Sequence, residues 1–462
     1  MTVPNRPASA PTDEQTTMEW LDQHAVHTVR TIGVHLDGTP VGHNLHRAAF
    51  EHALSLGPIM PAETLLTDVE GEPWLEAPRG WLETAGAPRQ RPDLSSLTAL
   101  GDGVARCMVD HVGADGTPIP ICPRARLAAL TETLEEHDVA LQVHFTLEGV
   151  IHRESPAEAR TKGHRGLTPV GTAGPSFRHD HQHRSVLTGL AHQLEAQDVA
   201  WQDWHSGSDA GQIRLVLAPA PPVRAADQAI AAREALRAAA ATMSASMSFL
   251  ATGPDAKVGN GTEITMHLGS QHQPTDSTTP HPKVMWWIGG LLATAPAASA
   301  ITNPTVNAYR RVGRFAGAPA HCIWGRHNRS ALLDIDSDHR SGISVTQLTH
   351  RGCSSDANPH LALAALIAGG LVGLVENLDP PAPSDATSWT QPVDHAPLPR
   401  TLVGARLALA EDKLLRPLLG AQLVETWLAA RRHEWLHFHR SSERPEVGTI
   451  TDWELKRYAE LG

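Results

Sequence analysis

The chain has 462 residues, of which 41% are hydrophobic, and a formal net charge of −12. This length suits two or three domains with a large core, and the negative charge argues against a nucleic-acid partner. No apolar run reaches the roughly 18 to 20 residues of a membrane span, no secretory signal is visible, and the four cysteines are widely spaced. We therefore expect a cytoplasmic protein without a disulfide framework or a membrane partner.

The first 118 residues predict a tail followed by a small α+β domain. Residues 1–27 begin with a stretch rich in Pro, Ser, Thr and Ala and are expected to form a disordered or helical tail. Apolar alternation on both sides of Asp37-Gly38 predicts a β-hairpin, and residues 105–112 predict another strand. The small domain is expected to cover residues 28–118.

Residues 119–462 predict a larger domain in which strands and helices alternate. Strands are expected over residues 139–151, 213–217 and 264–268. Helices are expected over residues 124–137, 185–197, 225–241, 286–300, 360–374 and, with breaks, 402–439. This alternation, with long loops between elements, favours a mixed domain of helices and strands.

Six short motifs follow one another along the larger domain and its entry. In chain order they are Asp115-Gly116-Thr117-Pro118 with Cys122-Pro123-Arg124, Asn260-Gly261, Asn303 to Arg311 with Ala318-Pro319, Asn328-Arg329-Ser330, Ala357 to Leu361, and Thr451 to Tyr458. In this order they resemble the glutamine synthetase family, which phosphorylates a glutamate side chain with ATP and then forms an amide with ammonia or an amine.

This resemblance implies a glutamine-synthetase-like α+β fold. Residues 28–118 would form a β-grasp-like domain, and residues 119–462 a catalytic domain built on a curved antiparallel sheet. The family assembles into rings with active sites between subunits, so the resemblance also implies a homo-oligomer such as a dodecamer.

The resemblance assigns roles to residues that bind acids. Asn260, Gly261, Arg311 and Arg351 match positions that bind glutamate, and Arg329 matches one that contacts the transferred phosphate. Guanidinium groups bind carboxylate or phosphate in bidentate fashion, which favours a small anionic ligand. The alternative is that these arginines persist in structural ion pairs with Asp334, Asp336 or Asp356.

Only some of the family's nucleotide-binding residues are found in this chain. His267 matches a nucleotide-binding position of the family. Ser344 and Gln347 stand where the family has basic residues, and Asp334 stands in place of an arginine.

Most metal-binding positions of the family carry other residues in this chain. Glu148 is the one remaining ligand, while Thr146, Ser206, Arg214, Thr265 and Thr349 replace the others, and Gly317 replaces the acidic residue that helps to accept a proton from ammonium. Magnesium and manganese need hard oxygen ligands, mainly carboxylates, and a permanent cation at close range repels them. Arg214 can instead take the place of the metal and pair with Glu148 or an anionic substrate, which gives both residues and Arg329 a candidate catalytic role.

Other residues could still form a different metal site. Asp209 and Glu263, expected in loops at the site, could replace lost carboxylates in part, and His205 and His350 could rebuild a different site with Glu148. A separate run of alternate histidines predicts either a metal patch on an extended segment or a solvated polar loop; its members are His179, His181 and His183.

Three functions remain open from the sequence. The first is an enzyme repurposed for metal-poor, ATP-independent acyl-transfer, amide-forming or lyase chemistry on a glutamate-like or other anionic substrate, in specialised metabolism and without a cofactor. The second is an ATP-dependent γ-glutamyl amide ligase with a rebuilt metal site, using Mg²⁺ or Mn²⁺ and an unusual amine. The third is a catalytically inactive binding or regulatory subunit.

Overall fold

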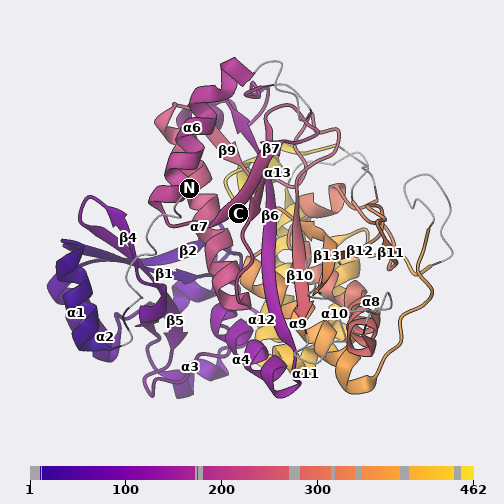
Figure 1. Cartoon of the computed structure of the whole chain (residues 1–462), viewed down its shortest axis with the longest axis horizontal. Helices are drawn as coiled ribbons and strands as arrows, with labels where there is room; N and C mark the ends of the chain where they lie inside the picture. Colours follow the sequence, from indigo (N-terminus) through magenta and orange to yellow (C-terminus); the bar gives the residue numbers. More distant parts are fainter. Residues whose placement is uncertain are drawn as a thin grey trace.

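The computed structural model describes residues 11, 13–171, 174, 180–269, 281–313, 318–338, 345–385, 395–441 and 449–462. Figure 1 shows a small sheet with its helices on one side of the molecule and a large sheet beside it, next to a group of long helices. The long helix α7 (Pro222–Thr242) runs between the two sheets. The functional site described below lies on the large sheet.

The small sheet has five strands in the order β2-β1-β5-β3, with β4 paired to β5. Its strands are β1 (Thr28–Val34), β2 (Pro40–His46), β3 (Arg89–Pro92), β4 (Thr98–Gly101) and β5 (Val104–Val112). β1 is antiparallel to β2, which confirms the predicted hairpin, and parallel to β5. Helices α1 (Glu14–Gln23), α2 (Arg47–Leu56) and α3 (Gly80–Ala85) accompany it. Trp20, Leu21 and Phe50 join Val29 of β1 in its buried core.

The large sheet has eight strands in the order β11-β12-β13-β10-β6-β8-β7, with β9 paired to β6. Its strands are β6 (Ala140–His152), β7 (Trp201–Ser206), β8 (Gln212–Leu217), β9 (Ser246–Ser248), β10 (Gly261–Gly269), β11 (Trp324–Arg326), β12 (Leu333–Asp338) and β13 (Val345–Ser354). All neighbouring strands are antiparallel except β11 and β12. The sequence predicted β6, β8 and β10 but not the strands β12 and β13.

The central strand β6 separates a core face from a polar face. Val143, Phe145 and Leu147 are at most 1% exposed and belong to the main hydrophobic core, which also includes residues of α4 and α7. Successive side chains of a strand point to opposite faces. The residues that alternate with them, such as His144 and Glu148, therefore lie on the other face, which carries the polar side chains.

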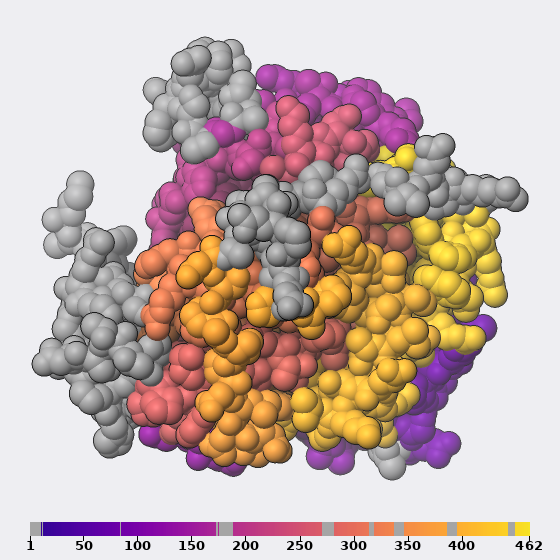
Figure 2. All heavy atoms as spheres, turned by 90° about the vertical axis from the view of Figure 1, so that its right-hand side faces the viewer, coloured from indigo at the N-terminus to yellow at the C-terminus, as the bar shows by residue number. Residues whose placement is uncertain are grey.

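The helices of the larger part surround the core. They are α4 (Pro123–Glu136), α5 (Pro156–Thr161), α6 (Asp180–Ala196), α7, α8 (Pro282–Thr302), α9 (Pro359–Glu376), α10 (Leu402–Glu411), α11 (Leu415–Leu419), α12 (Ala421–Arg440) and α13 (Asp452–Tyr458). The predicted helices match α4, α6, α7, α8, α9 and the group from α10 to α12. Seen from the side, the later segments form most of one face of the molecule (Figure 2).

Helices α8 and α9 cross at unusually close range in the core. A Cβ atom added to Gly290 would lie 2.2 Å from the carbonyl oxygen of Gly369, and one on Gly373 would lie 1.9 Å from that of Trp286. Only glycine allows this approach. Among the described residues, these two helices are long and apolar enough to cross a membrane, but 78% and 83% of their apolar windows are buried inside the protein. This burial is typical of core helices.

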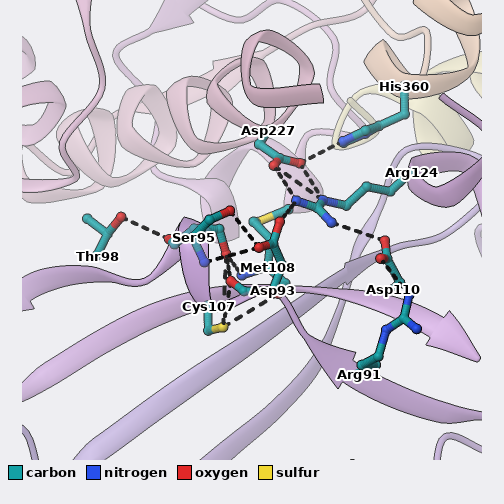
Figure 3. A network of polar contacts seen from close by, with 11 residues as sticks. Arg91, Asp93, Ser95, Thr98, Cys107, Met108, Asp110, Arg124, Asp227 and His360 are labelled. Carbon is teal, nitrogen blue, oxygen red and sulfur yellow. Dashed lines mark hydrogen bonds and ion pairs between the residues drawn. The ribbon is translucent and has the colours of Figure 1, made fainter. Parts of the chain in front are cut away.

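A cluster of ion pairs joins the small domain to helices α4, α7 and α9, and we call it the interdomain network: Arg124, Asp93, Asp110, Asp227 and His360 (Figure 3). Arg124, at the start of α4, pairs with Asp93 and contacts Asp110 at 3.1 Å and Asp227 at 3.0 Å. His360 of α9 lies 2.8 Å from Asp227. The arginine of one predicted motif and the histidine of another therefore meet at the contact between the small sheet and the helices.

Candidate functional site

A row of five charged residues crosses five neighbouring strands on the polar face of the large sheet. We call it the charge row: Arg214 of β8, Glu148 of β6, Glu263 of β10, Arg351 of β13 and Asp334 of β12. Arg214 lies 3.0 Å from Glu148 and also pairs with Glu263. Arg351 pairs with the other oxygen of Glu263 and lies 3.0 Å from Asp334. Every member thus contacts at least one group of opposite charge.

The strand register explains why these residues meet. Glu148 lies directly opposite Arg214, and Glu263 lies opposite Thr146. Residues directly opposite in an antiparallel pair share a face and have neighbouring side chains. Arg214 can therefore reach across β6 to Glu263. The sequence predicted the contact between Arg214 and Glu148, but it placed Glu263 in a loop, and that prediction is wrong because Glu263 belongs to β10.

The charges of the row stabilise one another in a partly buried setting. Its five side chains are between 11% and 18% exposed. Burial raises the pKa of Glu263, but the charges of Arg214 and Arg351 more than offset this effect and hold that pKa below its ordinary value. Burial lowers the pKa of Arg214, and the neighbouring Glu263 and Glu148 raise it above its ordinary value. Both groups are therefore ionised at neutral pH.

The donor set does not fit a divalent metal ion. Arg214 places its guanidinium between Glu148 and Glu263, and the second oxygen of Glu148 accepts a hydrogen bond of 2.7 Å from the backbone of Gly261. Thr265 and Thr349 join their hydroxyls to each other at 3.0 Å. A metal at this place would meet a cation and neutral hydroxyls. Within the described ranges, no three His, Cys, Asp or Glu residues are grouped to hold a metal ion.

Asp209 holds a loop instead of replacing a lost metal ligand. Its carboxylate accepts hydrogen bonds from the backbone N–H groups of Lys257, Val258 and Gly259, each at 3.0 Å. The loop leads into Asn260, whose amide donates to the carbonyl of Leu250 at 2.7 Å. The suggestion that Asp209 takes part in a rebuilt metal site is therefore not supported by its contacts.

Gly261 brings the backbone close to Arg311. A Cβ atom at Gly261 would lie 2.3 Å from the guanidinium of Arg311, so a side chain here would displace that group. Arg311 is only 6% exposed. Burial lowers its pKa, and the charges of the nearby Glu148 and Glu263 offset this effect only in part. The predicted substrate-binding residues Asn260, Gly261 and Arg311 thus lie beside the charge row.

Arg329 is exposed at the border of the charge row, and its charge helps to lower the pKa of Glu263. We define the acid cluster as the charge row together with Arg311 and Arg329. It holds four guanidinium groups against three carboxylates, so one net positive charge remains. The contact between Arg351 and Asp334 agrees with the predicted alternative of a structural ion pair for that arginine.

Further along the same face, His267 forms a pair with His144. Nδ1 of His144 lies 2.9 Å from Nε2 of His267, and both rings are half-buried. Burial, with a contribution from His267, lowers the pKa of His144 to about 4. The pair is therefore neutral at pH 7. Sequence reasoning missed His144, because only the register of β6 against β10 places it next to His267.

The other predicted metal groups are not assembled. His350 is buried, and burial lowers its pKa to about 4, whereas His205 contacts Asp203 at 3.0 Å in an exposed position. Gly317 and Ser344 lie outside the described residues, as do His179 and the side chains of His181 and His183. The backbone of these last two residues belongs to α6, so the predicted extended segment is wrong there.

Comparisons with known proteins agree with this fold. The family model "Glutamine synthetase, catalytic domain" matches residues 120–458. Among curated relatives, the gamma-glutamylpolyamine synthetase GlnA3 of Streptomyces coelicolor is 28% identical over 414 residues, covering 84% of each chain. The gamma-glutamylethanolamide synthetase GlnA4 of the same organism is 25% identical over 384 residues, covering 82% of this chain and 80% of its own.

A solved structure of a novel glutamine synthase homolog has the same architecture. It superimposes with a TM-score of 0.77 at 24% identity and covers 95% of this chain and 99% of its own. These matches confirm the predicted α+β fold class and the family resemblance read from the motifs.

Proposed function

Because the chain belongs to the glutamine synthetase family, we propose that it binds a small carboxylate-bearing substrate at the acid cluster and acts on it without a divalent metal or ATP. The observation that carries this proposal is the position of Arg214. Its guanidinium lies between Glu148 and Glu263, where the family resemblance places metal ligands.

The electrostatics of the cluster support an anionic ligand. Phosphoryl transfer from ATP depends on metal ions that neutralise the phosphates. In this chain a fixed guanidinium occupies the corresponding region and remains charged at any physiological pH. The net positive charge of the acid cluster then favours a carboxylate, which Arg311 and Arg329 are placed to attract.

Loss of the metal-binding residues also restricts the chemistry. Making an amide from a free acid and an amine is unfavourable in water and needs coupling to ATP. Exchanging the amine part of an existing amide keeps the bond type and needs no such coupling. Acyl transfer from a glutamate-type amide to an amine is therefore the form of the proposed function that the site supports best.

Calorimetric titration of the purified protein tests this proposal. We expect glutamate or a γ-glutamyl amide to bind equally well in EDTA and in Mn²⁺, and we expect ATP with Mg²⁺ or Mn²⁺ to give no tight binding. Tight metal-dependent binding of ATP would overturn the proposal. If neither the acid nor ATP binds, a catalytically inactive binding or regulatory subunit becomes the better account.

A second candidate function is an ATP-dependent γ-glutamyl amide ligase. The names of two relatives favour it, since they are a gamma-glutamylpolyamine synthetase and a gamma-glutamylethanolamide synthetase. The decisive assay is release of ADP from ATP in the presence of glutamate, Mg²⁺ and either spermidine or ethanolamine. Amine-dependent release of ADP would establish the ligase and exclude the metal-free reaction as the main activity.

A further inference from the structure

A cavity of about 570 Å³ is lined in part by the loop that Asp209 holds, close to the acid cluster. Val150 and Asn260 are among its lining residues. Val150 lies two residues beyond Glu148 on the same face of β6, which is about 7 Å along the strand. Asn260 directly precedes Gly261, whose backbone contacts Glu148. The lining of the cavity therefore begins two residues from Glu148 along β6 and one residue from Gly261.

The walls of the cavity are mostly apolar. They come from β6, β9, α5, α7, α13 and adjoining loops, and include Val150, Ala159, Leu167, Met247, Leu250 and Leu455. A cavity of this size falls within the range of small-molecule sites, which combine apolar walls with a few polar groups. The volume is large enough for an aromatic ring with a short linker.

Most charged groups on the walls are already compensated, and Asp255 and Lys257, which also line the cavity, are exposed. Arg160 binds Glu460 in bidentate fashion at 2.6 and 2.8 Å, and Arg237 lies 3.0 Å from Glu234. The carboxylate of Asp209 faces the loop amides. Burial lowers the pKa of His152 to about 4, so this ring is neutral. The cavity thus offers little to a highly charged ligand body.

We propose that this cavity holds the apolar part of a ligand whose acid end is bound by the acid cluster. The ligand class is a glutamate-type acid that carries an uncharged, preferably aromatic, amide or ester group, and this inference rests on the proposed function. The carboxylate lies at the arginines, the chain passes Glu148 and Gly261, and the apolar group extends past Val150 into the cavity. A polyamine is disfavoured, because three of the four wall carboxylates, Asp209, Glu234 and Glu460, are engaged.

Calorimetry with L-glutamate and with L-glutamic acid γ-anilide tests this inference in the full-length protein. We expect the anilide to bind about tenfold more tightly or better, since burial of a ring of this size has at least that effect. If glutamate binds and the anilide binds no more tightly, the inference is overturned while the proposed function stands. If neither compound binds, the proposed function itself fails and takes the inference with it.

Two matched variants test whether the aromatic ring of the anilide lies in this cavity. Ala241 lines this cavity near the end of α7, whereas Ala238, three residues earlier on the same helix, lines a different cavity. Ala241→Trp should remove the preference for the anilide and leave glutamate binding unchanged, while Ala238→Trp should change neither. Equal effects of the two variants on the anilide would overturn the inference. Ser246→Trp, from another wall of the cavity, serves the same purpose if Ala241→Trp does not fold.

Discussion

The charge row and the interdomain network use the same chemistry in different surroundings. In both, guanidinium groups contact carboxylates from several elements. Arg124 of the network has only 5% of its side chain exposed and reaches three aspartates. The row lies on one face of a sheet, with side chains up to 18% exposed and the exposed Arg329 beside it.

This difference separates a structural ion-pair cluster from a candidate binding site. The donors of Arg124 are all directed to carboxylates that the small domain and α7 bring together. No ligand could enter without separating those elements. The acid cluster, in contrast, has a positive group at its border and a cavity at one end. We therefore expect changes in the network to affect stability, and changes in the cluster to affect binding as well.

The largest expected effect is that of Arg124→Met. In the wild type, burial raises the pKa of Asp227, but the charge of Arg124 holds that pKa below its ordinary value. Removal of the guanidinium leaves Asp227 buried without its main counter-ion. The free energy of unfolding should fall by about 3–5 kcal/mol. Urea unfolding followed by circular dichroism measures it. Arg91→Met is the control, because Arg91 is half exposed and lies 3.5 Å from Asp110, and it should cost less than about 1 kcal/mol.

A smaller loss of stability is expected for Glu263→Gln, which removes the central carboxylate of the charge row. Arg214 and Arg351 each keep one partner, so the loss at pH 7 should be roughly 1–3 kcal/mol. Since the pKa of Glu263 is depressed in the folded protein, its contribution is fully present above the unfolded pKa. The difference between wild type and variant should shrink as pH falls below about 4.5.

The control for this experiment is Asp336→Asn on β12, whose side chain is 61% exposed. It should change the unfolding free energy by less than about 0.5 kcal/mol at every pH. Equal losses for the two variants would mean that the charge row contributes no more than a surface charge.

Replacement of Arg329 should weaken binding without changing stability. Replacing this exposed arginine with Met should weaken glutamate binding roughly tenfold, because one charge-assisted contact is lost, and should leave the unfolding midpoint unchanged. Arg326→Met, three residues earlier and also exposed, should alter neither property. Calorimetry and urea unfolding of both variants measure the two effects. A large loss of stability at Arg329 would remove the distinction between the row and the network.

The smallest effect concerns the histidine pair. Burial and His267 lower the pKa of His144 to about 4, so the unfolded chain takes up a proton at a higher pH than the folded protein does. The stability from this neutral ring is present above about pH 6.5 and falls as the pH is lowered toward 4. His144→Gln should flatten the dependence of urea stability on pH in that window. The control is His46→Gln at an exposed position. If both variants show the same slope of unfolding free energy against pH, the contribution of His144 is contradicted.

Local sequence patterns predicted the hairpin, four further strands and six helical regions of the larger domain, and motif order was sufficient to predict the family. It also predicted the contact of Arg214 with Glu148, because two strand residues at matched motif positions face the same metal site in the resembled family. The strands β12 and β13 were missed. The β12 sequence, Leu333–Asp338, alternates over only six residues, three of which are aspartates, and aspartate is uncommon in strands. The β13 sequence, Val345–Ser354, has no clear alternation.

The remaining site residues depend on register, which a single sequence does not reveal. Glu263 joins the row because β10 pairs with β6 so that Glu263 lies opposite Thr146. A shift of one residue would turn its side chain into the core. The contact of His144 with His267 has the same origin. The role of Asp209 depends on the path of a loop, where no periodicity guides a prediction.

The central claim is that Arg214 takes the place of a metal ion. It is tested most directly by titrating Mn²⁺ into wild type and Arg214→Glu and following the electron paramagnetic resonance signal of the free ion. We predict that wild type leaves the ion free, while Arg214→Glu binds it through Glu148, Glu263 and the new carboxylate. Arg326→Glu, which makes the same charge change at an exposed position, should not bind it. Tight uptake of Mn²⁺ by wild type, or no gain in the folded Arg214→Glu variant, would contradict the account.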